Sequence, residues 1–186
     1  MTAVFHRSRF DRMFLCFLMY SILGWCYEVF LEVIVYRWGY SDRGVLFGPW
    51  CPVYGVGAML LLLCFSRTLR AKLPFPKNAL RVLGLFLGCM AVATALELAA
   101  SYMLEAATGA WPWQTYRDYR WNFQGRIALS PSLRFGLGGL LFLYALQPLF
   151  ERILNAIGEG RVRKYARVML GIFSLDCLAF ALKLII

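Results

Sequence analysis

Three glutamates lie inside long apolar runs of this sequence, where an ionised side chain is costly. Glu28 and Glu32 are four residues apart, so they share one face of a helix. Glu97 follows Thr94 by three residues and precedes Ser101 by four, which gives a polar stripe on a second helix. A charge at the membrane centre costs about 2.5–3.5 kcal/mol even on the milder scales, so these acids must face other helices or water. Their chemistry would be the binding of a cation or a proton.

Three arginines are expected near the same end of the apolar runs. Arg134 lies in the first turn of the fourth run, and Arg43 and Arg126 lie beside the runs on the predicted outer side. Counting along the helices places Glu28 and Glu97 at similar depth, in the outer half of the membrane. We therefore expect a polar site open to the outside, in which the arginines bind an anionic group. The alternative is a structural set of Glu–Arg pairs between helices.

The stretch LFGPWCPVYGVG (46–57) interrupts an apolar run with two prolines and three glycines. A helix over 52–66 rises only about 22 Å, less than the ~30 Å hydrocarbon core. Proline disrupts helix, and non-helical backbone cannot face lipid, so we expect residues 44–51 to be buried in protein or to line a wet cavity. The prediction is a broken or re-entrant second segment (44–66) that carries the candidate binding residues Cys51 and Tyr54. A kinked helix packed through small residues is the alternative.

A second irregular region is the aromatic outer loop (105–130), which contains WPWQTYRDYRWNFQGR. An interfacial belt of Trp and Tyr explains most of its aromatic residues. The belt does not explain the polar residues Asp118, Asn122 and Arg126, and the last two are candidate binding residues. Ser130 followed by Pro131 predicts a helix N-cap and a proline at the first helical position.

The elements that carry these residues follow from composition. The chain has 186 residues, of which 61% are hydrophobic and 16% charged. Five apolar stretches approach the ~20 residues that cross a bilayer, at about 13–36, 45–65, 82–104, 131–150 and 168–186. The first stretch is too long for a signal peptide and is interpreted as a retained helix. We predict an all-α, polytopic membrane protein whose residues 1–186 form a single integral membrane domain.

The net charge of +10 is divided unequally between the two sides of the predicted spans. The arm and loops on the N-terminal side of the spans hold thirteen Lys and Arg residues, and those on the other side hold five. The positive-inside rule then predicts a cytoplasmic N-terminus and an outer C-terminus in the inner (cytoplasmic) membrane. This bias favours anionic lipid headgroups as partners over nucleic acid.

Motifs for other chemistry are missing from the sequence. There is no G-x-x-x-x-G-K-[ST] phosphate loop, and His6 is the only histidine. The six cysteines form no C-x-x-C and mostly lie in apolar spans. We therefore expect no catalytic residue, metal or cofactor. Asp176, in the last span, either hydrogen-bonds locally or lines a path to the cytoplasm.

Several blocks of the sequence resemble a known family. They are YSILGWCYEVF (20–30), DRGVLFGPWCPVYGVGA (42–58), the Leu96-Glu97 pair and NFQGRIALSPSLRFGLGG (122–139). Together they are similar to the bacterial ABC-transporter type IV, or CmpB-like, permease family over about residues 13–150. The resemblance implies a permease component. A Trp-Asp-Tyr run of the family is replaced here by Gln114-Thr115-Tyr116.

Three functions remain open. The first is a transporter that binds an unknown small solute or ion and needs a homo-oligomer or another membrane subunit, with a separate ATPase for an ABC mechanism. The second is a membrane enzyme for a lipid or lipid-linked substrate at the outer leaflet, with Glu28 or Glu97 as general base and arginines holding a phosphate. The third is a non-catalytic membrane scaffold whose charges are structural.

Overall fold

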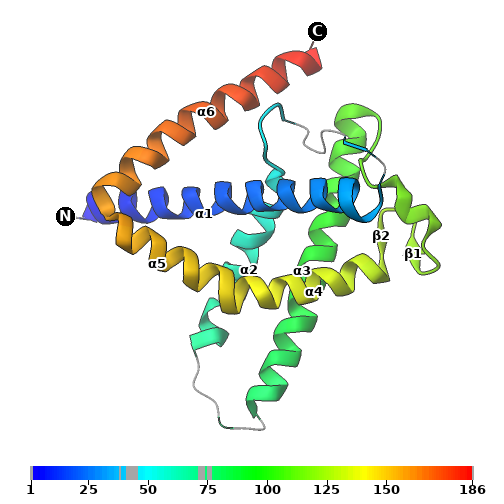
Figure 1. Cartoon of the computed structure of the whole chain (residues 1–186), viewed down its shortest axis with the longest axis horizontal. Coiled ribbons are helices and arrows are strands. Elements are labelled where there is room, and N and C mark those ends of the chain that lie inside the picture. Colours follow the sequence, from blue (N-terminus) through cyan, green and yellow to red (C-terminus); the bar gives the residue numbers. More distant parts are fainter. Residues whose placement is uncertain (1, 38, 41–45, 71–73, 75–76, 186) are drawn as a thin grey trace. The chain divides into compact units, whose positions relative to one another are not determined.

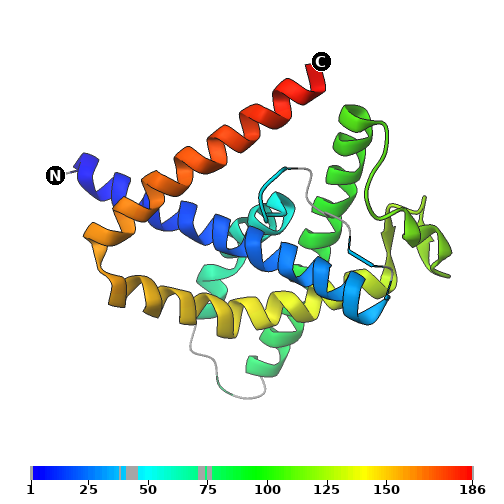
Figure 2. The same ribbon diagram turned by 45° about the horizontal axis from the view of Figure 1, so that its top comes forward.

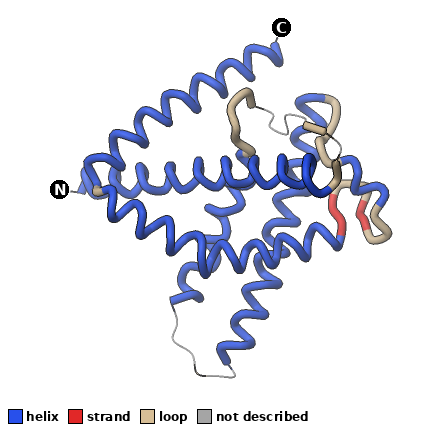
Figure 3. The backbone as a smooth tube through the Cα atoms, viewed as in Figure 1, coloured by secondary structure: helices blue, strands red, loops and turns tan. Residues whose placement is uncertain are grey.

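The protein is almost entirely helical, as predicted. The computed structural model describes residues 2–37, 39–40, 46–70, 74 and 77–185, and 83% of the chain is helical (Figure 3). The elements are α1 (Thr2–Phe30), the π-helical turn η1 (Leu31–Val35), α2 (Pro52–Arg70), α3 (Lys77–Thr108), the 3-10 turn η2 (Gln114–Asp118), β1 (Asn122–Phe123), β2 (Ile127–Ala128), α4 (Leu129–Leu141), the π-helical turn η3 (Phe142–Leu146), α5 (Gln147–Ile157) and α6 (Glu159–Ile185).

Five membrane spans are confirmed within the described residues. They cover Arg9–Val35, Pro52–Leu69, Lys77–Thr108, Leu129–Ile157 and Glu159–Lys183. Most extend beyond the predicted apolar stretches, because charged residues end a hydropathy run without ending a helix. The predicted basic loop between the last two spans is mostly helix. Only Gly158, at a φ of +84°, separates α5 from α6.

The chain divides into two compact units. Unit 1 comprises Met1–Met59 and Phe150–Ile186, and unit 2 comprises Leu60–Leu149. Helices α2 and α5 each begin in one unit and end in the other along the chain. That residues 1–186 act as one integral membrane domain stays a prediction.

Unit 1 is built on α1 and α6, which lie against each other near the N-terminal half of α1 (Figures 1 and 2). Its core holds the buried residues Leu18, Leu46 and Trp50. Phe173 of α6 makes edge contacts with the rings of Trp50, at 5.7 Å, and Phe17, at 5.5 Å. The core therefore joins α1, α6 and the residues just before α2.

A polar corner joins α1 to α5 and α6 in unit 1. The Arg12 guanidinium donates to Glu151 at 2.6 Å, Asn155 at 2.8 Å and Glu159 at 2.9 Å. Both carboxylates are thus paired with one arginine, which ties the three helices together where α5 turns into α6.

Unit 2 is built on the close packing of α3 against α4. A Cβ added at Gly139 would lie 2.5 Å from Cys89 Cβ, so the glycine lets the two helices approach. The Thr94 hydroxyl donates to Ser132 at 2.8 Å across the same interface. Small and hydroxyl residues thus supply both the close contact and the polar link.

A short antiparallel hairpin leads into α4. Asn122 pairs with Ala128 and Phe123 pairs with Ile127. The predicted N-cap at Ser130 is wrong, because α4 begins at Leu129 and Ala128 is its N-cap, with no side-chain hydrogen bond. The strand passes straight into the helix at this point, and the backbone N–H of Leu129 donates to Trp121 O at 2.9 Å. The hairpin therefore replaces the side-chain cap.

Candidate functional site

Glu28 and Tyr54 are brought together in unit 1. The Tyr54 hydroxyl donates a hydrogen bond to Glu28 Oε1. Gly24 lies one turn before Glu28 in α1, and a Cβ there would overlap the Tyr54 ring. The absence of a side chain at Gly24 therefore makes room for the tyrosine. Among the described residues, no basic side chain is bonded to Glu28.

The backbone is non-helical just before Tyr54. Residues 46–51 form no helix, and α2 starts at Pro52. We call residues 46–51 the non-helical segment. Trp50 and Cys51 are buried, with Cys51 only 6% exposed, and its N–H donates to Ser21 O of α1 at 2.9 Å. The expected break in the backbone is thus present, whereas re-entry into the membrane stays a prediction.

Asp176 holds the non-helical segment from α6. Its Oδ1 accepts a hydrogen bond from Phe47 N at 2.9 Å, and its Oδ2 accepts bonds from Gly48 N at 2.8 Å and Trp50 Nε1 at 2.7 Å. These partners precede Asp176 by more than 120 residues, so the bonds are not the local ones considered from sequence. The carboxylate therefore fixes a loop that the sequence alone does not connect to it.

The remaining candidates of unit 1 are Glu32 and Arg43. Glu32 lies in the π-helical turn η1 and is 5% exposed. Arg43 lies outside the described residues. A buried glutamate one turn after Glu28 agrees with the expected inward face of α1.

In unit 2, Glu97 of α3 also accepts a hydrogen bond from a tyrosine. Glu97 is 7% exposed, and the Tyr116 hydroxyl donates to its Oε1 at 2.9 Å. Tyr116 lies in η2, within the predicted aromatic loop. The loop therefore supplies a donor to the acid of the helix as well as aromatic surface.

Arg126 lies in an aromatic cage in the same unit. Its guanidinium lies 4.1 Å from the ring centres of both Tyr102 and Trp111 and is bonded to Glu105 Oε2 at 2.5 Å. It also donates to Ser101 Oγ at 3.4 Å, and the residue is 8% exposed. Such a stacked, paired arginine ties the loop to α3.

Asn122 and Arg134 also make contacts within unit 2. Asn122 Oδ1 accepts from Gly125 N at 2.8 Å and its amide donates to Tyr119 O at 2.7 Å, so the side chain braces the hairpin turn. Arg134 of α4 donates to the Tyr119 hydroxyl at 3.3 Å. Both side chains therefore meet the loop around Tyr119.

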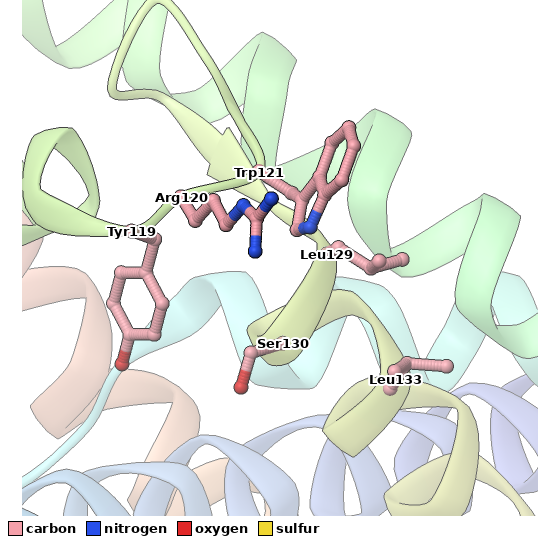
Figure 4. Close-up of a pocket in the computed structure, with 6 residues that line it drawn as sticks. All are labelled: Tyr119, Arg120, Trp121, Leu129, Ser130 and Leu133. Atoms are coloured by element: carbon pink, nitrogen blue, oxygen red, sulfur yellow. The ribbon is translucent and has the colours of Figure 1, made fainter.

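An open pocket lies beside this loop (Figure 4). It is lined by Tyr119, Arg120, Trp121, Leu129, Ser130 and Leu133. The Arg120 guanidinium extends into the space between the labelled side chains, and Leu129 and Leu133 lie on one side of it. The accessible lining is almost wholly apolar, which suits an acyl chain or another apolar group.

The predicted residues thus fall into two sets. Unit 1 holds Glu28, Glu32, Cys51 and Tyr54, and unit 2 holds Glu97, Asn122, Arg126 and Arg134. Sequence reasoning missed the partners of these residues, among them Glu105, Tyr116 and Trp111, and the role of Asp176. From the sequence, Glu105 is predicted to lie in the loop, although α3 continues through it to Thr108. Glu105 follows Glu97 by eight residues, and this helical spacing was the signal that could have placed both on one face of α3. That all the acids and arginines share one site stays a prediction.

The five spans and the polar side chains they carry define a multi-pass membrane protein. A model of the family described as "Putative ABC-transporter type IV" matches residues 15–180. The chain belongs to this family, which confirms the resemblance found in its sequence blocks. The comparison with curated proteins and the comparison with solved structures gave no match. Family membership therefore supports an ABC-transporter-type membrane protein and leaves the substrate to be inferred.

Proposed function

We propose that this chain is the permease part of a transporter for a small solute or ion. Its family membership supports transport, and its five spans support a membrane-embedded role. Five spans are few for a complete pathway, so the transporter contains a second copy or another membrane subunit. The sequence carries no phosphate loop, so any ATP hydrolysis belongs to a separate ATPase subunit.

The observation that carries the proposal is the Glu28–Tyr54 pair. The Tyr54 phenol donates a hydrogen bond to the Glu28 carboxylate but brings no positive charge to it. In a membrane span a bare charge is unfavourable, and a bound cation or proton compensates it. We infer a cationic substrate or a coupling ion at this glutamate.

Glu97 provides a second acid with a tyrosine donor, in unit 2. Glu32 and Cys51 complete the proposed binding residues of unit 1 together with Arg43. Asn122, Arg126 and Arg134 complete those of unit 2, where the arginines attract an anionic group of the substrate or of a lipid. In this proposal the polar groups open to the outer side of the cell membrane, with the N-terminus in the cytoplasm.

The test is transport by purified protein in proteoliposomes. Gradients of H⁺, Na⁺ and K⁺ are imposed in turn on wild type, Glu28→Gln and Glu97→Gln. Asp118→Asn serves as the matched control, because that aspartate is exposed and lies outside the proposed binding residues. We expect flux in wild type and in the control and its loss in both site variants. Equal flux in all four proteins would refute the assignment of the glutamates.

The second candidate is an enzyme for a lipid or lipid-linked substrate. The open pocket beside Arg120 favours it, because its apolar lining matches the acyl chain of a lipid. Under this candidate, with Glu97 as the general base, Glu97→Gln retains a bound lipid and loses turnover. Loss of stability or of oligomer yield in the same variant, with no bound molecule, would instead indicate a scaffold.

A further inference from the structure

The backbone N–H groups of residues 47–51 all have partners, and Asp176 accepts half of them. From residue 47 to residue 52 the two prolines have no N–H. The N–H groups of Phe47 and Gly48 donate to Asp176, at 2.9 and 2.8 Å. The N–H of Trp50 donates to Gly48 O at 2.8 Å, and that of Cys51 to Ser21 O at 2.9 Å. Unpaired groups at this position would be unfavourable in an apolar medium.

The indole of Trp50 adds a third donor to the same carboxylate. Trp50 Nε1 lies 2.7 Å from Asp176 Oδ2, while the ring packs against Phe173, one turn earlier in α6. The segment is thus attached to α6 by one polar and one apolar contact. It is attached to α1 by the bond from Cys51 to Ser21 and by the packing of Trp50 with Leu18.

The attachment leads directly to the Glu28–Tyr54 pair. The non-helical segment ends where α2 begins, and Tyr54, the third residue of α2, donates its N–H to Cys51 O at 3.1 Å. Any shift of the segment therefore moves the ring that donates to Glu28. Gly24 leaves room for that ring beside α1, because a Cβ at this position would overlap it.

We propose that Asp176 is the positioning residue of the unit 1 site. Its carboxylate holds residues 47–50 between α1 and α6 and thereby places Tyr54 against Glu28. The functional part of this inference rests on the proposed role of Glu28 in transport, whereas the structural part does not. Asp176 acts through the segment and does not itself touch the substrate.

The chemistry at position 176 requires two acceptor oxygens. In Asp176→Asn one oxygen is replaced by an NH₂ group, which faces N–H donors and accepts none of their hydrogen bonds. Asp176→Glu keeps both acceptors on a stem longer by one methylene group and is the conservative variant. The native cysteines supply a probe, because Cys51 is the last residue of the segment and is buried.

The experiment measures labelling of each native cysteine by a charged methanethiosulfonate reagent, identified by peptide mass spectrometry. In wild type we expect Cys51 to react slowly, like the buried Cys16 and Cys89. In Asp176→Asn we expect Cys51 to react on the order of tenfold faster, because its segment opens locally while Cys16 and Cys89 stay protected. Asp176→Glu restores most of the protection.

Two results would overturn the inference. The first is unchanged labelling of Cys51 in Asp176→Asn. The second is equal exposure of Cys16 and Cys89, which would mean that Asp176 stabilises the whole protein rather than this segment. Asp118→Asn, at an exposed position in unit 2, is the matched control and leaves the labelling pattern unchanged.

The same variants separate this inference from the proposed function. Selective labelling of Cys51 together with reduced ion flux in Asp176→Asn supports both. Selective labelling without any ion flux in wild type refutes the proposed transport and leaves the positioning of the segment intact. Normal flux in Asp176→Asn despite selective labelling would refute the functional link to Glu28.

Discussion

Replacement of Arg126 is the change whose effect on the free energy of unfolding follows most clearly from the structure. Arg126→Met keeps an unbranched side chain between the Tyr102 and Trp111 rings but removes the charge. A hydrogen bond to a charged group contributes about 1.5–3 kcal/mol. We take the lower end for the bond to Glu105, because that side chain is 40% exposed and screened by solvent.

Arg126→Met also loses the stabilisation from the two cation–π contacts with Tyr102 and Trp111. Each contributes roughly 0.5–1 kcal/mol at an exposed site and about 2 kcal/mol when desolvated, and Arg126 is buried. We therefore expect Arg126→Met to lower the free energy of unfolding by about 3–5 kcal/mol. Arg126→Lys keeps the charge but loses the planar stacking. We expect it to lower the free energy of unfolding by roughly half as much as Arg126→Met does.

The assay is titration from mild detergent micelles into sodium dodecyl sulfate, followed by circular dichroism of the helices. Arg120→Met is the matched control, because Arg120 is exposed and its guanidinium lies 5.6 Å from the centre of the Trp121 ring, farther than Arg126 lies from its two rings. We expect the control to change stability by less than about 0.5 kcal/mol. An Arg126→Met variant as stable as Arg120→Met would refute the view that the cage ties the loop to α3.

Three further predictions use the same titration. Gly55→Ala places a Cβ against a side chain and the backbone of α1 and should cost about 1–3 kcal/mol, whereas Gly171→Ala, with open space around it, should be neutral or slightly stabilising. Equal effects would contradict the close α1–α2 contact. Gly158→Ala forces a Cβ into the left-handed conformation between α5 and α6 and should cost about 1 kcal/mol. Thr94→Val removes the hydroxyl bond to Ser132 and should cost about 0.6 kcal/mol, and a gain in stability would contradict that bond.

Hydropathy was sufficient to predict the helical class and the five spans, because lipid imposes a length and an apolar composition on each of them. The prolines before α2 also predicted the non-helical backbone correctly, since proline lacks an N–H. The predicted ends of the helices were less accurate than the number of spans. The residues around Arg152 and Arg161 belong to helices although they are charged, because the backbone bonds of a helix do not depend on the polarity of its side chains.

The partners of the polar residues could not be read from one sequence. Asp176 binds a segment more than 120 residues away, and no periodicity relates the two positions. The predicted helix N-cap at Ser130 was wrong, because α4 begins at Leu129, whose backbone N–H is bonded to Trp121 O, just before β1. The pairing of Arg126 with Glu105 depends on how the loop folds back on α3. Such pairings are set by tertiary structure, which local spacing does not encode.

The most direct test of the central claim is native mass spectrometry of the detergent-purified protein, with wild type compared to Glu28→Gln. The account predicts a stoichiometric small molecule or ion on wild type that is absent from the variant, while both proteins keep the same oligomeric state. The exposed control Asp118→Asn should retain the bound species. A bound species that persists in Glu28→Gln, or two empty proteins that differ only in stability, would contradict a substrate site at Glu28.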